Sequence, residues 1–301
     1  MSNLFFQKDG TAQGVAKQRF IETLAEPNKR IVNDPYAERF VLGAGLIKLM
    51  GHKLSVWLTK QLAPGFHEHL ICRTRFIDEL IKKEASTGIE QYVILGAGYD
   101  LRAHRLDLPN TLKVFEVDQV EVQSRKRGKL PEELASAENV TYVGIDFNHQ
   151  SLTEQLTVAG FDQSKRTVFT LEGVSQYITK EALLSTINEL ASLSKKAGST
   201  FFFSYVNDLL DKDPEACFGK GYPNAVKRAK LVKDLSAKVG EPWISLYSSE
   251  EIESLLGTCG FSLKENKTLA DLNELYFTPV GRTIPENEIF KLEHFVIAEH
   301  E

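Results

Sequence analysis

Two short segments of the chain combine residue types that commonly bind a nucleotide. Residues 92–100 form an apolar run that ends in the turn Gly96-Ala97-Gly98, and a second apolar run ends on Asp118, 20 residues after Gly98. In α/β proteins a glycine turn lets the backbone approach a ligand, and an acid at the tip of the next strand accepts hydrogen bonds from ribose hydroxyls. The pair predicts a nucleotide site, although a plain strand-to-helix turn followed by a surface acid would have the same residues.

Two further acids extend this pattern to the following predicted strands. Asp146 follows the apolar run 141–145, and Glu172 follows the run 167–171. An acid after the third strand can accept a hydrogen bond from an adenine amino group, with Phe147 beside the base. Taken alone, Asp146 could equally cap a helix that begins near Ser151. Three acids that close consecutive strands are improbable by chance, so the set favours a ligand at the carboxyl edge of a parallel sheet.

The glycine turn lacks one feature of a dinucleotide site. Leu101 stands where the dinucleotide fingerprint has its third glycine. That glycine lets the following helix pack closely beneath a pyrophosphate. Its absence argues against NAD and favours a ligand without phosphates.

Other chemically capable residues are less specific. Arg73, in a predicted helix, could pair with a ligand carboxylate or lie on a solvated helix face. The segment His67-Glu68-His69 resembles part of a metal site, but no third ligand follows at a useful spacing, so it is interpreted as loop or helix surface and no metal is expected. The basic run 124–129 is interpreted as the exposed end of a helix. The sequence shows no convincing Ser/His/Asp or Cys/His arrangement.

These residues need an α/β framework to position them. Apolar periodicity predicts an N-terminal helical region with helices at about 11–25, 36–50, 53–62 and 67–85. Alternating strands and helices follow, which favours a mostly parallel, doubly wound sheet. The predicted strands are 92–95, 113–117, 141–145, 167–171, 200–205, 261–264 and 295–298, and the main helices between them are 151–159, 180–196 and 249–259.

One segment interrupts this alternation. Residues 206–244 are charged, contain three prolines and include one predicted amphipathic helix near 224–238. Such an insertion between strands usually covers the ligand, so we interpret it as a lid. The predicted organisation is an N-terminal helical cover (1–88), a nucleotide-binding Rossmann-like core (89–205), a lid or substrate insertion (206–244) and the C-terminal part of the core sheet (245–301).

Composition limits the classes of partner. The 301 residues carry 36 Lys plus Arg against 41 Asp plus Glu, a net charge of −5 that offers no electrostatic footprint for nucleic acid. The three cysteines have no paired spacing, which predicts buried thiols in a reducing compartment. No signal-peptide pattern and no apolar stretch of about 18 residues is present, so we expect a cytoplasmic protein without a membrane partner. The oligomeric state cannot be predicted.

Taken together, these residues resemble the leucine carboxyl methyltransferase superfamily of S-adenosylmethionine-dependent enzymes. Within it, the chain is most similar to the bacterial and fungal branch that methylates oxygen atoms of small molecules. The matching segments span nearly the whole chain and are highly specific in combination. They are Asp34-Pro35-Tyr36-Ala37; Arg73-Thr74-Arg75 with Asp78; Leu95-Gly96-Ala97-Gly98-Tyr99-Asp100 with Arg102 and Arg105-Leu106; Phe115-Glu116-Val117-Asp118-Gln119; Asp146-Phe147; Glu172-Gly173 with Tyr177-Ile178; and Gly240-Glu241-Pro242-Trp243 ahead of a helix that ends Cys259-Gly260-Phe261.

The resemblance implies a fold and a cofactor. The fold is the class I methyltransferase fold, an α/β Rossmann-like, doubly wound sheet of seven strands whose last strand is antiparallel, with an N-terminal helical cover. The cofactor is S-adenosyl-L-methionine, which leaves as S-adenosyl-L-homocysteine. No metal is implied.

The resemblance also assigns roles to individual residues. Arg73, assisted by Lys17, would pair with the methionine carboxylate of the cofactor. The turn Gly96-Ala97-Gly98 would line the methionine moiety. The further cofactor-binding residues are Asp118 at the ribose, Asp146 and Phe147 at the adenine, and Glu172 near the methyl group. Gln119, next to Asp118 in the matching segment, is also expected to bind the cofactor. Two positions depart from the family pattern: Phe147 replaces a common leucine, and Tyr177 follows Ser175-Gln176 where relatives are more apolar.

The implied reaction is a direct in-line transfer of the sulfonium methyl group. A carboxylate acceptor is already ionised at pH 7, whereas a phenol or alcohol would need a base that the sequence does not identify. We therefore expect O-methylation of a carboxylate or an acidic hydroxyl on a small molecule. Glu172 and Tyr177 are the predicted catalytic residues, and the predicted acceptor contacts are Tyr177, Tyr205, Tyr222 and Trp243.

Three alternatives remain open at this point. The first is methylation of a protein C-terminus, against which stand a lid of only about 40 residues and the closer small-molecule resemblance. The second is an NAD(P)-dependent oxidoreductase, which Leu101 and the acids after the third and fourth strands disfavour. The third is a non-catalytic nucleotide-binding protein that retains the cofactor cleft.

Overall fold

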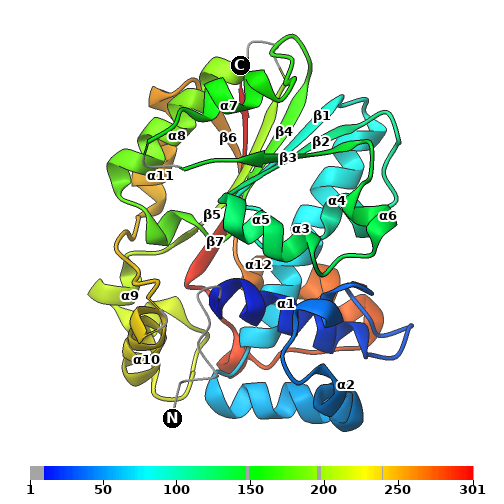
Figure 1. The fold of residues 1–301 in the computed structure, drawn as a ribbon. Helices are drawn as coiled ribbons and strands as arrows, with labels where there is room; N and C mark the ends of the chain where they lie inside the picture. The colour runs from blue at the N-terminus through cyan, green and yellow to red at the C-terminus, as the bar shows by residue number, and fades with distance from the viewer. Residues whose placement is uncertain (1–9, 147–148, 195–197, 239, 301) are drawn as a thin grey trace. The chain divides into compact units, whose positions relative to one another are not determined.

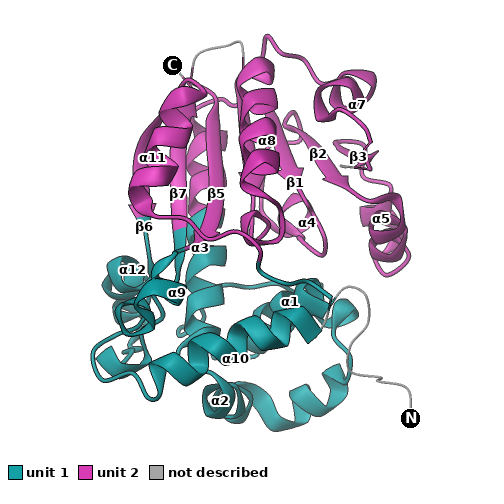
Figure 2. Ribbon diagram, turned by 90° about the vertical axis from the view of Figure 1, so that its left-hand side faces the viewer, with its two compact units in different colours: residues 1–77, 207–243, 267–294 teal, residues 78–206, 244–266, 295–301 magenta. Residues whose placement is uncertain are grey.

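The computed structural model describes residues 10–146, 149–194, 198–238 and 240–300 (Figure 1). The chain divides into two compact units, each assembled from separate stretches of sequence (Figure 2). Unit 1 consists of Met1–Ile77, Asn207–Trp243 and Lys267–His294, and unit 2 consists of Asp78–Val206, Ile244–Asn266 and Phe295–Glu301. The predicted boundaries after residues 88, 205 and 244 divide the chain into consecutive segments, whereas each unit combines separate segments. This predicted division stays a prediction. The positions of the helical cover and of the lid also stay predictions.

Seven strands of the described chain form one sheet with the order β3-β2-β1-β4-β5-β7-β6. The strands are β1 (Gln91–Leu95), β2 (Lys113–Asp118), β3 (Val140–Gly144), β4 (Thr167–Leu171), β5 (Thr200–Val206), β6 (Phe261–Lys267) and β7 (Glu293–His300). Each lies where the sequence predicts a strand, with ends that differ by up to three residues. The apolar runs form strands because a sheet covered on both faces buries every side chain, and all residues of β1, β4 and β5 are buried.

The pairing of the strands defines a mixed sheet. Strands β1 to β5 pair in parallel. Strand β7 runs antiparallel to β5, because backbone hydrogen bonds join Gly198 to His300 at one end and Asn207 to Leu292 at the other. The predicted fold, with an antiparallel last strand, is therefore confirmed.

Helices cover both faces of this sheet (Figure 1). On one face, α7 (Leu152–Val158), α8 (Lys180–Leu193) and α11 (Ser249–Thr258) share a continuous core with side chains of the strands. Phe115 and Val117 of β2 belong to that core, so the intervening Glu116 points to the other face. There it meets α4 (Arg102–Arg105) and α5 (Val120–Arg127), while α6 (Glu132–Ala135) precedes β3.

Unit 1 is mainly helical (Figure 2). Its helices are α1 (Gly10–Thr23), α2 (Ala44–Leu62), the first part of α3 (Phe66–Ser86), α9 (Leu209–Lys212), α10 (Ala225–Lys238) and α12 (Leu269–Tyr276), with short 3₁₀ turns at Ala37–Phe40, Pro214–Cys217, Thr278–Val280 and Glu286–Glu288. A small core joins α1 to α2 through Phe20, Ile21, Ile47 and Val56. The predicted amphipathic helix near 224–238 is confirmed as α10.

One predicted helix is wrong. The pattern predicts a helix over 36–50, but the structure has a 3₁₀ turn at Ala37–Phe40 and begins α2 at Ala44. Asp34 accepts hydrogen bonds from the backbone N–H groups of Tyr36 and Ala37, which closes a short turn rather than starting a long helix. Gly51, at φ 70° and ψ 180°, then kinks α2 at the place where a gap between two helices is predicted.

Two expectations from composition can be compared with the structure. All three cysteines, Cys72, Cys217 and Cys259, are buried, as predicted. Among the described residues, no helix combines the length and the apolar character that a membrane span requires.

Candidate functional site

The predicted ligand edge of the sheet exists in unit 2. The register places Leu95 opposite both Val117 and Leu171, and Asp118 opposite Gly144. The segments that begin at Gly96, Asp118, Ile145 and Glu172 therefore leave four adjacent parallel strands at the same edge. In open α/β sheets this carboxyl edge, where the direction of strand order reverses, is the usual place for a ligand.

The glycine turn has a backbone that other residues would strain. Gly96 and Gly98 have φ angles of 62° and 45°, in the left-handed region that favours glycine. A Cβ atom on Gly96 would lie 2.9 Å from Cγ2 of Val174, which is closer than normal packing allows. The turn therefore packs closely against Val174, and Ala97 within the turn is buried.

Asp118 is joined directly to this turn. The backbone N–H of Gly98 donates to Oδ2 of Asp118 at 2.6 Å, and the N–H of Gln119 donates to Oδ1 at 2.7 Å. Two backbone donors orient the carboxylate and stabilise its charge. The structure thus brings together Gly98, Asp118 and the exposed Gln119, the residues predicted for the first two strands.

Asp146 lies at the same edge, beyond β3. Its side chain is about half exposed and its Oδ2 lies 2.7 Å from Nδ1 of His149. The alternative role of Asp146 as a helix cap is wrong, because Ser151 is the N-cap of α7 and accepts from the N–H of Glu154. Phe147 lies outside the described residues.

Glu172, after β4, belongs to a buried charge network that the sequence did not reveal. Its Oε2 accepts a hydrogen bond from Nη1 of Arg102 at 2.6 Å. Arg102 also binds Asp100 and, through Nε at 2.8 Å, Asp78. Arg105 donates twice to Asp78 at 2.6 Å.

Arg102 is the centre of this network. Its side chain is 2% exposed and three carboxylates surround it. Burial opposes its charge, but Asp100, Glu172 and Asp78 raise the pKa of Arg102 above its usual range. The side chain of Glu172 is consequently held in place by Arg102. The sequence indicated this network only through Arg102 and Arg105, whose spacing places both on one face of the helix that follows the glycine turn.

A second buried pair contacts the segment directly after the glycine turn. Nζ of Lys126 lies 2.6 Å from Oε2 of Glu116 and also donates to the carbonyl of Asp100. Burial raises the pKa of Glu116 despite the opposing charge of Lys126. Nε2 of His104 lies 3.7 Å from the same carboxylate and 3.2 Å from the hydroxyl oxygen of Tyr142, with which it shares a hydrogen bond. The basic run 124–129 is thus only partly exposed, since Lys126 is buried.

Lys17 and Arg73 belong to unit 1. Lys17 is exposed on α1. Arg73 is buried in α3, where its Nη1 donates to both oxygens of Glu293 at 2.6 and 2.8 Å, and Nε2 of His69 lies 2.6 Å from Glu293 as well. The alternative of a solvated helix face is therefore wrong for Arg73, while its contact with a cofactor carboxylate stays a prediction.

The four residues predicted to contact the acceptor have different surroundings. Tyr177 is half-buried in the 3₁₀ turn Ser175–Tyr177 of unit 2. Tyr205 is fully buried in the sheet core, and its hydroxyl is held by Ser249 at 3.0 Å and Asn266 at 3.1 Å. These contacts give Tyr205 a structural role, so we leave it out of the proposed acceptor contacts.

Tyr222 and Trp243 belong to unit 1. Tyr222 stacks on Phe218 with ring centroids 4.1 Å apart, and its hydroxyl donates to the carbonyl of Pro64 at 2.8 Å. Trp243 is half-buried, and its indole N–H has no hydrogen-bond partner in the part of the chain that the structure describes. A buried donor of this kind is suited to an acceptor atom of a ligand.

The segment His67-Glu68-His69 is not a surface segment. All three side chains are buried in the first turns of α3. His67 contacts Glu22 and Gln18 of α1, and His69 contacts Glu293. The sequence could not show this, because the partners lie far away in the chain.

The strand order and the ligand edge define a class I methyltransferase fold. Two solved structures are similar in fold. A candidate methyltransferase from Thermobifida fusca has a TM-score of 0.55 and 17% identity, and the match covers 88% of this chain and 93% of that chain. A DUF574 family protein from Streptomyces avermitilis has a TM-score of 0.58 and 15% identity, and the match covers 95% of this chain and 97% of that chain.

Sequence comparisons identify the family. The model of the leucine carboxyl methyltransferase family matches residues 12–191. YktD of Bacillus subtilis is 34% identical over 229 residues, which are 75% of this chain and 70% of YktD. A Rhodococcus jostii protein is 37% identical over 60% of this chain and 62% of its own length, and a Mycolicibacterium paratuberculosis protein is 31% identical over 92% and 88%. All three are named candidate S-adenosyl-L-methionine-dependent methyltransferases.

The chain belongs to the leucine carboxyl methyltransferase family. The resemblance that the sequence motifs indicate is therefore confirmed.

Proposed function

We propose that this protein transfers the methyl group of S-adenosylmethionine to an oxygen atom of a small molecule, most directly a carboxylate. Family membership and the names of the relatives support S-adenosylmethionine-dependent methyl transfer. The observation that supports the position of the cofactor best is the 2.6 Å hydrogen bond from Gly98 to Asp118, at the edge where four parallel strands end.

The residues at this edge fit the parts of the cofactor. The tight turn at Gly96 and Gly98 lets backbone atoms approach the methionine moiety without a side chain between them. The oriented carboxylate of Asp118 can accept hydrogen bonds from the ribose hydroxyls. Asp146, exposed at the next strand end, can accept from the adenine amino group. Arg73 and Lys17 are the proposed partners of the methionine carboxylate.

The chemistry divides between the cofactor and the chain. When bound, the cofactor supplies a methyl group that is already activated by its sulfonium. The chain supplies position and alignment, effects that can lower a barrier by about 7–11 kcal/mol. Glu172, held in position by Arg102, would place negative charge near the positively charged sulfur.

A carboxylate acceptor needs no general base, because it is ionised at neutral pH. An acidic hydroxyl is the second acceptor that this chemistry allows. We propose that Tyr177 contacts the acceptor. This residue lies in the segment after Glu172, at a position where the sequence departs from the family pattern. The indole N–H of Trp243 and the Tyr222 ring are the proposed contacts from unit 1, and the indole donor suits an acceptor oxygen.

A protein C-terminus is a second candidate acceptor. The description of the matching family, leucine carboxyl methyltransferase, favours it. Its reacting group would also be a carboxylate, so both candidates share one chemistry. They differ in the size of the methylated product.

A labelling experiment tests this proposal. The protein is incubated with methyl-labelled S-adenosylmethionine and separately with the small-molecule and the protein fraction of a cell extract. We expect label in the small-molecule fraction that mild base releases as methanol, since methyl esters hydrolyse in base and methyl ethers do not. Base-stable label would contradict a carboxylate acceptor, and label confined to protein would contradict a small-molecule acceptor.

A further inference from the structure

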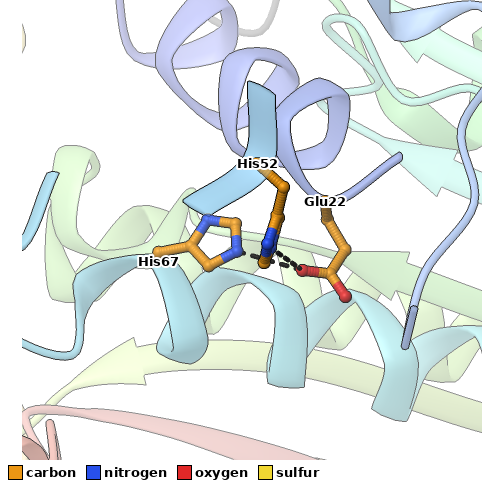
Figure 3. Close-up of side chains that lie close together, drawn as sticks. All are labelled: Glu22, His52 and His67. Atoms are coloured by element: carbon orange, nitrogen blue, oxygen red, sulfur yellow. Dashed lines mark hydrogen bonds and ion pairs between the residues drawn. The ribbon is translucent and has the colours of Figure 1, made fainter. Parts of the chain in front are cut away.

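Three side chains of unit 1 converge on one point. Nε2 of His67 lies 3.0 Å from Oε2 of Glu22, and Nε2 of His52 lies 3.4 Å from the same oxygen (Figure 3). One donor atom from each residue lies within 4.8 Å of the other two. Glu22 and His67 are fully buried, and the side chain of His52 is 18% exposed.

Each residue comes from a different helix, so the cluster depends on the fold. Glu22 lies in the last turn of α1 and His67 in the first turn of α3. His52 directly follows Gly51, the kink of α2, which sets the direction of the second half of that helix. The imidazole rings of His52 and His67 meet edge to face, with centroids 5.7 Å apart, and both present Nε2 to the carboxylate (Figure 3).

Neighbouring groups fix the orientation of the buried ligand atoms. Nδ1 of His67 lies 2.9 Å from the amide oxygen of Gln18. In the tautomer that donates from Nδ1 to that oxygen, the lone pair on Nε2 of His67 points at Oε2 of Glu22. Two electron-rich atoms 3.0 Å apart require a cation between them, either a proton or a metal ion.

The other carboxylate oxygen of Glu22 is occupied by protein donors. Oε1 accepts from the N–H of Ile31 at 2.8 Å and from Arg282 at 2.7 Å. Oε1 of Glu22 is therefore anchored, and Oε2 is directed toward the two imidazoles.

We propose that Glu22, His52 and His67 form a binding site for a divalent transition-metal ion, with zinc as the best match. Two imidazole nitrogens and one carboxylate oxygen are a common zinc donor set, with a water molecule as fourth ligand. Ligand atoms about 2.1 Å from zinc at a tetrahedral angle lie roughly 3.4 Å apart. The two distances to Oε2, 3.0 and 3.4 Å, fit this geometry, and the ring of the part-exposed His52 can adjust most easily.

The contacts outside the donor set match those of known metal sites. Histidine ligands commonly pair their other ring nitrogen with an oxygen, as Nδ1 of His67 does with Gln18. Ligating carboxylates are themselves hydrogen-bonded, as Glu22 is. The exposed part of His52 leaves a path for the ion. The site would join α1, α2 and α3, which gives it a structural role in unit 1 that does not depend on the proposed methyl transfer.

Cobalt binding tests the site directly, because Co²⁺ takes zinc ligands and its visible absorption reports its coordination. The full-length protein is first freed of metal with a chelator and then titrated with Co²⁺, followed by displacement with Zn²⁺. We expect one Co²⁺ per chain and displacement by Zn²⁺. His52→Ala, which removes the most exposed ligand, should weaken binding about 100-fold or more.

Two further variants make the result specific. His149→Ala removes an exposed histidine of unit 2 and should leave cobalt binding unchanged. Gln18→Ala keeps all three ligands and should weaken binding by about 10-fold or more, because the tautomer of His67 is no longer fixed. Absence of stoichiometric Co²⁺ binding, or equal binding by the wild-type protein and both cluster variants, would overturn the proposal and leave a proton-bridged cluster of histidine and glutamate.

Discussion

At the scale of single residues, each acid of the candidate site has a partner that fixes it. Asp118 is held by the N–H of Gly98, and Glu172 is held by Arg102. The acids themselves could be predicted, because residue type and position after an apolar run are local properties. The role of Arg102 could not, because its three carboxylate partners lie at positions 78, 100 and 172 and meet only in the fold.

The buried His104 provides a prediction for the pH dependence of stability. Burial, with a contribution from the charge of Lys126, lowers the pKa of His104 from 6.5 to about 4. The unfolded chain therefore binds a proton below pH 6.5 that the folded chain does not bind until about pH 4. This stabilisation is present above pH 6.5 and is lost as the pH falls through that window, by on the order of 1–3 kcal/mol.

Urea unfolding at pH 6.5 and 4.5 measures this effect. The variant His104→Gln should lose less free energy of unfolding than the wild-type protein between these two pH values. His149→Gln, which changes an exposed histidine, should keep the wild-type difference. If His104→Gln also kept it, another group would carry the pH dependence.

At the scale of elements, the strands were predictable and one helix was not. Most of the strands coincide with apolar runs, because a sheet covered by helices on both faces leaves no polar alternation to interpret. Strand β6, at the edge of the sheet, is mainly polar beyond Leu263 and only its first residue is fully buried. The predicted start of α2 was wrong because the side chain of Asp34 accepts a backbone hydrogen bond and closes a short turn. Such a side-chain hydrogen bond competes with helix formation, and the periodicity of apolar residues does not reveal it.

Gly51 is the element-scale position that we expect to be least tolerant of change in α2. Its backbone, at φ 70° and ψ 180°, lies in a region that is essentially restricted to glycine. Gly51→Ala should therefore lower the free energy of unfolding by about 1–3 kcal/mol. Gly45→Ala, at an uncrowded position in the same helix, should be neutral or stabilise by up to about 1 kcal/mol. Equal unfolding midpoints in urea for the two variants would show that the kink is not required.

At the scale of the whole molecule, each unit is built from three separate stretches of sequence. The sheet order was predictable only through the family resemblance, because residue patterns identify strands but not their neighbours. The same limit explains the histidine cluster. His67 appeared to lack a third ligand because the spacing rule examines nearby sequence, whereas Glu22 and His52 approach it from α1 and α2.

The central claim is that the strand ends of unit 2 bind S-adenosylmethionine through Asp118. Calorimetric titration with S-adenosylhomocysteine, the reaction product, tests it without knowledge of the acceptor. Three proteins are compared: the wild type, Asp118→Ala, and Glu138→Ala, which removes an exposed acid just before β3 at the opposite edge of the sheet.

We expect one binding site in the wild-type protein and in Glu138→Ala, and no comparable binding of NAD. Asp118→Ala should bind at least about 100-fold more weakly, because it loses two hydrogen bonds to a charged group. Unchanged affinity of Asp118→Ala for S-adenosylhomocysteine would contradict the proposed ribose site, and tighter binding of NAD would contradict the choice of cofactor.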